Sequence, residues 1–324
     1  MEKNTLLQVK DLVVEYAADK KIIQAVNHVS FTLRRGETLG LVGETGAGKT
    51  TIARAILGIL PDPPAKVKQG EILFEGQDLL KLPHRKMSHI KGNEISMIFQ
   101  DPMTALNPIM KVGKQIAEAI RLHNKMSRAE AEIEAIKMLE MVGIPGERFN
   151  EYPHQFSGGM KQRVIIAMAL ACKPKLLLAD EPTTALDVTI QAQVLEMMNQ
   201  LKQEMDTSVL LITHDLGVVA EMCDKVAVVY AGEIVEMGTA EQVFDHTAHP
   251  YTKGLFQSLP SLDSTEKRLK PIKGMMPDPT ELPTGCKFCE RCPYASEECR
   301  ADGMEMQDLG DGHCVLCRKV KEVS

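Results

Sequence analysis

One short segment decides the fold of this chain: Gly43-Glu44-Thr45-Gly46-Ala47-Gly48-Lys49-Thr50. A glycine, four residues and then Gly-Lys-Thr is the spacing of a phosphate-binding loop, or P-loop. Its glycines let the backbone curl so that successive N–H groups point at phosphate oxygens, and the following helix adds its positive N-terminal end. A strand-like run at 37–42, rich in apolar and β-branched residues, and helix-forming residues at 49–60 supply the strand and the helix that this loop requires. We therefore expect an α/β nucleotide-binding core with a mostly parallel sheet.

The chemistry of the predicted site follows from this loop and a second strand. We expect the loop to bind ATP, with Lys49 reaching the outer phosphates and the Thr50 hydroxyl ligating Mg²⁺. The apolar run 176–179 indicates a buried strand that ends in the carboxylates Asp180 and Glu181. Asp180 is suited to bind Mg²⁺ through water, and Glu181 to orient the water that attacks the γ-phosphate. The predicted ATP-binding residues of the loop and its helix are Gly43, Glu44, Thr45, Gly46, Ala47, Gly48, Lys49, Thr50 and Thr51.

Composition limits the class of partner. The 324 residues carry a formal net charge of -6, so a general attraction to nucleic acid or to an anionic membrane surface has no support. The N-terminal residues lack the pattern of a secretory signal, and the longest apolar stretch, 164–172, is far shorter than the roughly 20 residues that cross a bilayer as a helix. We expect a protein that stays inside the cell, has no nucleic-acid partner and reaches the membrane only through another subunit.

Two changes in residue composition divide the chain. Helix formers dominate from about residue 101, and Ser127 with Glu130 forms a capping-box pattern that opens an amphipathic helix. This stretch, about 101–160, is predicted to be a helical insert. Beyond Gly238 prolines accumulate and then cysteines begin. We expect a nucleotide-binding domain at 1–240 and a small cysteine-rich domain at 241–324.

A second glycine motif identifies the class of ATPase. Phe156-Ser157-Gly158-Gly159-Met160-Lys161-Gln162-Arg163 resembles the signature motif of ABC ATPases, with Met where the commonest form has Gln. Ser157 and the N–H groups around Gly158 and Gly159 begin a helix, which suits them to grip a phosphate. The resemblance implies that this motif faces the ATP of a second ATPase subunit, in a head-to-tail pair that holds two ATPs. Hydrolysis of ATP is then the expected activity.

Other positions of the ABC family fall in order along the chain. Gln100 is similar to the glutamine that touches Mg²⁺ or the attacking water and contacts the transmembrane partner, and His214 to the histidine that bonds the γ-phosphate. Ala185-Leu186-Asp187 resembles the family's D-loop, and Tyr16 the aromatic residue that stacks on adenine. The resemblance thus implies three catalytic residues and three Mg²⁺ contacts. The catalytic residues are Glu181, His214 and Gln100, and the Mg²⁺ contacts are Thr50, Gln100 and Asp180.

Several stretches resemble the dipeptide and oligopeptide importers within this family, although nickel and glutathione importers share much of the pattern. That resemblance implies import of small peptides through two transmembrane permease subunits, at the cytoplasmic face of the membrane. A second ATPase chain, related or identical, and indirectly an extracytoplasmic peptide-binding protein would complete the system. A soluble ABC ATPase of translation or DNA repair would instead show two fused cassettes or a long coiled-coil insert, together with a basic surface, and none of these is visible in the sequence. The matching stretches are Tyr152-Pro153-His154-Gln155, 181–187, 232–238, His249-Pro250-Tyr251-Thr252, Gly285-Cys286 and Arg291-Cys292-Pro293.

Six of the eight cysteines lie between Cys286 and Cys317. Thiolates at close spacing bind Zn²⁺ or an iron–sulfur cluster, and reduced free thiols are the simpler alternative. Spacing alone leaves a zinc-ribbon set open beside a ferredoxin-like run; the first is Cys286, Cys289, Cys314 and Cys317, and the second is Cys286, Cys289 and Cys292. The resemblance to the peptide importers, some of which carry a [4Fe-4S] cluster, implies a different set. Its ligands are Cys286, Cys292, Cys299 and Cys317.

Overall fold

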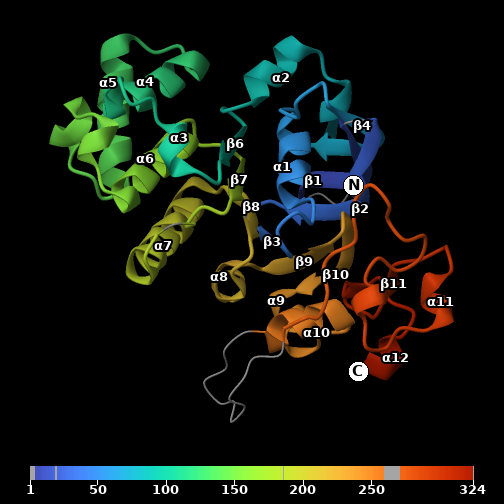
Figure 1. Cartoon of the computed structure of the whole chain (residues 1–324). Coiled ribbons are helices and arrows are strands. Elements are labelled where there is room, and N and C mark those ends of the chain that lie inside the picture. The colour runs from blue at the N-terminus through green and yellow to red at the C-terminus, as the bar shows by residue number, and fades with distance from the viewer. Residues whose placement is uncertain (1–3, 19, 185, 259–270, 324) are drawn as a thin grey trace. The chain divides into compact units, whose positions relative to one another are not determined.

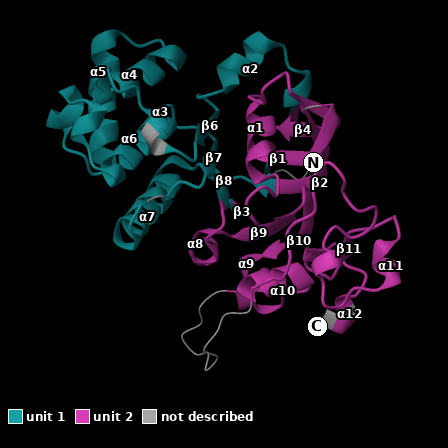
Figure 2. Cartoon of the chain, in the orientation of Figure 1, with its two compact units in different colours: residues 1–6, 33–38, 78–212 teal, residues 7–32, 39–77, 213–324 magenta. Residues whose placement is uncertain are grey.

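The computed structural model describes residues 4–18, 20–184, 186–258 and 271–323 (Figure 1). The chain forms two compact units, each built from separate stretches of sequence (Figure 2). Unit 1 comprises 1–6, 33–38 and 78–212, and unit 2 comprises 7–32, 39–77 and 213–324. The boundary that we expect near residue 240 therefore falls inside unit 2, between β10 and α9. Among the described residues, none of the helices combines the length and the apolar character needed to span a bilayer.

Unit 2 contains the strand that leads into the P-loop. This strand, β3, is buried along its whole length and pairs in parallel with β9, which explains its unbroken apolar sequence. In this unit the sheet runs β11-β12-β10-β9-β3, and β1, β2, β4 and β5 form a second, antiparallel sheet. The strands are β1 (Thr5–Ala18), β2 (Lys21–Arg34), β3 (Thr38–Val42), β4 (Ala65–Phe74), β5 (Gln77–Asp78), β9 (Lys225–Tyr230), β10 (Glu233–Thr239), β11 (Gln307–Asp308) and β12 (Cys314–Val315).

Short helices complete unit 2. The helix after the P-loop is α1, and it ends at Gly58, whose φ of 63° closes the last turn. The helices of this unit are α1 (Lys49–Leu57), α8 (Leu216–Met222), α9 (Ala240–Asp245), α10 (Pro250–Gln257), α11 (Glu297–Arg300) and α12 (Val320–Val323), with a 3₁₀ turn, η4 (Cys289–Arg291).

A buried carboxylate joins β10 to the C-terminal residues within unit 2. Glu236 is fully buried, and its two oxygens accept hydrogen bonds from the backbone N–H groups of Ala248 and His249, at 2.7 and 3.0 Å. Nε2 of His313 lies 2.9 Å from the same carboxylate. A buried carboxylate is tolerated only where such partners satisfy it. All three of these partners lie beyond residue 240.

Unit 1 carries three parallel strands and the helical part of the chain. The strands lie in the order β8-β7-β6, with Ile98 of β6 opposite Ala179 of β7. The strands are β6 (Ile95–Ile98), β7 (Leu176–Asp180) and β8 (Ser208–Thr213). The helices are α2 (His84–Ile90), α3 (Pro102–Ala105), α4 (Val112–His123), α5 (Arg128–Met141), α6 (Gly158–Leu170) and α7 (Val188–Met205), with 3₁₀ turns η1 (Leu79–Lys81), η2 (Gly146–Asn150) and η3 (Pro153–Gln155).

The stretch predicted to be a helical insert is helical in unit 1. The capping box of α5 is confirmed, since the Ser127 hydroxyl accepts from the Glu130 N–H at 3.3 Å and the Glu130 carboxylate accepts from the Ser127 N–H at 2.7 Å. Helices α4, α5 and α6 pack together, as Figure 1 shows. Helix α4 also packs against η2, and this contact depends on Gly113, because a Cβ there would overlap the ring of Phe149.

Gly113→Ala tests this packing. Alanine is intrinsically better than glycine inside a helix by about 1 kcal/mol, so an unpacked site would be stabilised. We expect the opposite, a loss of about 1–3 kcal/mol in the free energy of unfolding, because Phe149 must move. Urea denaturation measures it. The exposed neighbour Lys114, changed to alanine, should stay within about 0.5 kcal/mol of the parent protein, and a stabilised Gly113→Ala protein would contradict the contact.

Candidate active site

The P-loop lies in unit 2, between the end of β3 and the start of α1. Gly43, Gly46 and Gly48 have φ values of 152°, 86° and 102°, which side chains rarely adopt. A Cβ on Gly43 would also overlap the Val229 carbonyl, and one on Gly48 the Ala25 carbonyl. Only glycine therefore fits at these two positions. The loop is pressed against its own unit, while Thr45 and Gly46 stay exposed.

Lys49 closes the loop. It is the first residue of α1 and only 6% exposed, and its Nζ donates to the carbonyls of Gly43 and Glu44 at 2.7 and 2.9 Å. The ammonium is thus held inside the curl of backbone that the sequence predicts to bind phosphate. On the same helix the Thr51 hydroxyl lies 3.4 Å from the hydroxyl of Tyr16, the residue predicted to stack on adenine. Unit 2 also contains His214, which follows β8 and is exposed.

The predicted catalytic carboxylate lies in unit 1, together with Gln100. Asp180 ends β7 and is buried, and Glu181 follows it with a left-handed φ of 48°, unusual for a side chain of this size. The Glu181 carboxylate accepts hydrogen bonds from the Gln100 amide at 2.8 Å and the Thr184 hydroxyl at 3.0 Å. Gln100 follows β6, and β6 is the neighbour of β7 in this unit. Strand order therefore brings together two side chains that the sequence separates by 81 positions.

The signature motif begins α6 in unit 1. The Ser157 hydroxyl caps this helix by accepting from the Met160 N–H at 3.4 Å, and Ser157 and Gly158 are exposed. A capped, solvent-facing N-terminus of a 13-residue helix suits an anion. Gln162, buried one turn further, donates to the carbonyl of Pro182, so the helix is tied to the segment after Glu181.

The predicted D-loop is described only in part. Ala185 lies outside the described residues. Asp187 is the N-cap of α7, where its carboxylate accepts from the Ile190 N–H at 3.0 Å. The same Ile190 lies against Gly159 of the signature helix.

Two contacts to the P-loop were missed in the sequence. The hydroxyl of Tyr251 accepts from the Glu44 N–H at 3.0 Å, and the guanidinium of Arg291 lies 3.0 Å from each oxygen of the Glu44 carboxylate. Both residues occur in stretches that resemble the peptide importers, and this resemblance was the only indication in the sequence that they matter. Nothing in their local pattern indicated that they reach residue 44.

Five cysteines line one small cavity in unit 2: Cys286, Cys289, Cys292, Cys299 and Cys317. The sixth, Cys314, lines a different cavity. Burial, together with the neighbouring thiols, raises the pKa of Cys286 to about 12 and that of Cys292 to about 11. These thiols stay protonated at neutral pH unless a bound cation reverses the balance. Among the residues that the structure describes, no group of three or more His, Cys, Asp or Glu side chains already has a geometry that could hold a metal ion.

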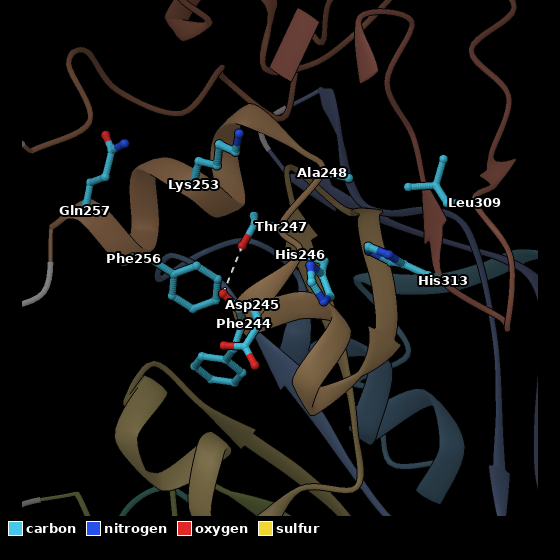
Figure 3. A pocket seen from close by; sticks show the side chains of 10 residues that line it. All are labelled: Phe244, Asp245, His246, Thr247, Ala248, Lys253, Phe256, Gln257, Leu309 and His313. Carbon is cyan, nitrogen blue, oxygen red and sulfur yellow. Dashed lines mark hydrogen bonds between the residues drawn. The ribbon is translucent and has the colours of Figure 1, made fainter. Parts of the chain in front are cut away.

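A separate pocket of about 640 Å³ lies between α9, α10 and the loop before β12 (Figure 3). The rings of Phe244 and Phe256 lie against each other within it, tilted by 32° with centroids 4.8 Å apart, and the Thr247 hydroxyl donates to the Phe244 carbonyl at 3.4 Å. None of the residues predicted from the sequence lines this pocket.

Comparison with known proteins settles the family. The chain is 52% identical to the oligopeptide transport ATP-binding protein OppD of Bacillus subtilis, over 96% of this chain and 87% of that protein. It is 51% identical to the dipeptide transport ATP-binding protein DppD of the same organism, over 98% and 95%. The chain belongs to the peptide-transporter ATP-binding subunits of the ABC family. The prediction from the signature motif and its neighbours is thus confirmed.

Sequence models divide this ABC subunit in two. The ABC transporter model matches 26–184, and the model of the oligopeptide/dipeptide transporter C-terminal region matches 235–299. The second match contains Tyr251, Arg291 and three of the four cysteines predicted as ligands, whereas Cys317 lies beyond it.

A solved structure agrees with the predicted fold. A dimeric ATP-binding cassette in a post-hydrolysis state with ADP and Pi superimposes with a TM-score of 0.66, at 26% identity, over 72% of this chain and 99% of that one. The α/β ABC ATPase fold, with mixed sheets and a helical part, is therefore confirmed, and the subunit is an ATPase.

The two glycines of the signature motif should respond differently to alanine. A Cβ on Gly158 meets nothing within 4 Å, whereas one on Gly159 would lie 2.6 Å from Cγ2 of Ile190. We expect Gly158→Ala to leave the free energy of unfolding within about 0.5 kcal/mol, and Gly159→Ala to lower it by about 1 kcal/mol. Urea denaturation measures both. In an Ile190→Ala background the effect of Gly159→Ala should vanish, and its persistence would contradict the contact.

Proposed function

We propose that this ABC ATPase energises the uptake of dipeptides and oligopeptides through partner permeases. The observation that carries the proposal is identity of about 50% to oligopeptide and dipeptide transport ATP-binding proteins along nearly the whole chain. The match to the oligopeptide/dipeptide transporter C-terminal region, over 235–299, also supports it.

The proposed chemistry assigns a role to each group of the site. The N–H groups of the P-loop and the Lys49 ammonium bind the phosphates, and Tyr16 stacks on adenine. Thr50, Gln100 and Asp180 would hold Mg²⁺, which would neutralise charge on the transferred phosphoryl group. Glu181 orients the attacking water, and its hydrogen bond from Gln100 supports this role by fixing the carboxylate before water arrives. His214 binds the γ-phosphate.

The proposed assembly contains two ATPase subunits. Ser157, Gly158 and Gly159 of one subunit grip the γ-phosphate bound to the P-loop of the other, with Asp187 near this junction. The open N-terminus of α6 supports that role, as does the dimeric state of the solved relative. Two permeases hold the pair at the cytoplasmic face of the membrane, and an extracytoplasmic binding protein delivers peptide to them. ATP closes the pair and hydrolysis reopens it.

Glu181→Gln tests the enzymatic half of the proposal. The variant keeps the hydrogen bond from Gln100 but cannot polarise water, so hydrolysis should fall by about 100-fold or more while ATP still binds. ATP-bound dimers should then accumulate, as light scattering would detect. Glu134→Gln, which alters an exposed carboxylate paired with Lys137 in the same unit, is the matched control and should hydrolyse normally. Normal turnover in the Glu181 variant would contradict the assignment.

The transport half requires the permeases. In vesicles that contain the whole complex and its binding protein, dipeptides should stimulate hydrolysis, and Glu181→Gln should abolish both this stimulation and uptake. Stimulation by nickel or glutathione in place of peptide would assign the protein to a related importer.

We further infer that Cys286, Cys292, Cys299 and Cys317 hold a [4Fe-4S] cluster. Their convergence on one cavity supports this set over the zinc-ribbon alternative, which needs Cys314. Four thiols are also the donor set that such clusters take. When bound, the cluster would cross-link the C-terminal segments, as structural metal sites do. Zn²⁺ is the alternative that the same thiols can bind.

Purification without oxygen tests this cluster. The protein should be brown, contain about four iron atoms per chain and bleach on reduction. Cys292→Ser should lose the colour because it removes a ligand, whereas Cys314→Ser should keep it. A colourless protein with one tightly held zinc would overturn the cluster.

A further inference from the structure

Glu44, the second residue of the P-loop, is held by two residues from the C-terminal part of unit 2. Its N–H donates to the Tyr251 hydroxyl, and its carboxylate forms a two-pronged ion pair with Arg291. Burial raises the pKa of Tyr251, so its hydroxyl stays neutral and able to accept this bond. A loop that binds anions through its backbone thus takes part of its shape from residues more than 200 positions away.

Arg291 is the fixed member of this ion pair. Its side chain is 6% exposed, against 30% for Glu44. Besides Glu44, the guanidinium donates to the Tyr230 hydroxyl at 3.3 Å and to the Lys273 carbonyl at 3.1 Å. It also lies 5.6 and 5.8 Å from the ring centroids of Tyr230 and Phe288. A buried guanidinium held by these contacts has little freedom, so it fixes where the Glu44 carboxylate lies.

Because Glu44 is negatively charged, its pairing with Arg291 affects how tightly the loop can bind ATP. A carboxylate on a phosphate-binding loop repels the charge that the loop must attract. Paired with Arg291, it is neutralised and turned toward the guanidinium. Without Arg291, the same carboxylate is free to face the incoming phosphates, and the repulsion grows with the number of phosphate charges.

We propose that Arg291 is a positioning residue of the ATP site, which acts by neutralising and orienting Glu44. The proposal rests on the proposed role of the P-loop in binding phosphate. Arg291 ends the turn η4 and stands directly before Cys292, so the cysteine-bearing segment contributes to nucleotide affinity through this one side chain.

A double-mutant cycle on the full chain tests the proposal, with the dissociation constants of ATP and ADP measured at one fixed ionic strength. Arg291→Gln should weaken ATP binding about 10-fold and ADP binding less, because ADP carries less charge. Glu44→Gln alone should bind ATP at least as tightly as the parent, since its amide can still accept from Arg291. The double variant should return to within about threefold of the parent, because no carboxylate remains.

Hydrolysis kinetics separate positioning from catalysis. In Arg291→Gln the KM for ATP should rise while kcat stays near the parent value, because Glu181 and Gln100 are untouched. Arg291→Lys keeps the charge and should retain affinity within about threefold. Thermal unfolding shows whether Arg291→Gln folds. If it does not, the ATP affinities of the two single variants Arg291→Lys and Glu44→Gln still test the proposal.

Two controls distinguish the possible failures. Arg300→Gln removes the same charge from the same cysteine-bearing segment, where Arg300 pairs with Glu290 and Glu297, and it should leave ATP affinity unchanged. Lys49→Ala should abolish ATP binding; if it does not, the proposed P-loop role fails. If Lys49→Ala behaves as expected but Arg291→Gln binds ATP like the parent, or the double variant binds no better than Arg291→Gln, only the present proposal is overturned. Weaker ATP binding by Glu44→Gln alone would also overturn it.

Discussion

The Lys49 ammonium lies almost fully buried and donates to two carbonyls of its own loop. Taking a charge out of water is costly, so a buried ammonium at this position favours the arrival of anionic oxygens. The loop can offer that site only while its backbone keeps left-handed turns at glycine positions. Several elements of unit 2 hold the loop in this conformation. Gly43 follows β3 and packs against the backbone of β9, and α1 carries Lys49.

Unit 1 brings an amide and a carboxylate together after two neighbouring strands. Parallel strands end at one edge of a sheet, so side chains that follow neighbouring strands meet there. Gln100 after β6 and Glu181 after β7 do so. The left-handed backbone at Glu181 is an uncommon conformation for a glutamate, and the hydrogen bonds from Gln100 and Thr184 keep its side chain in one place.

Sequence reasoning succeeded where the signal is local. The P-loop, the capping box at Ser127 and the strand that ends in Asp180 each depend on neighbours within a few residues, and each lies where we expected it. The ion pair between Glu44 and Arg291 joins positions 247 apart, and no local pattern encodes such a contact. Spacing could not choose among the cysteines for the same reason, because which thiols share a cavity depends on how the segment between Cys299 and Cys317 returns to η4.

Glu236 links the nucleotide-binding part of the sequence to the C-terminal region. The Glu236 carboxylate is fully buried, and Ala248, His249 and His313, which satisfy it, all come later in the chain. Strand β10 therefore depends on residues that follow it. A fragment that ended after β10 would lack these three partners, and the negative charge of Glu236 would have to be buried without them. The C-terminal region is therefore no detachable appendage, and joining it to another cassette would require a carboxylate at this position of the receiving strand.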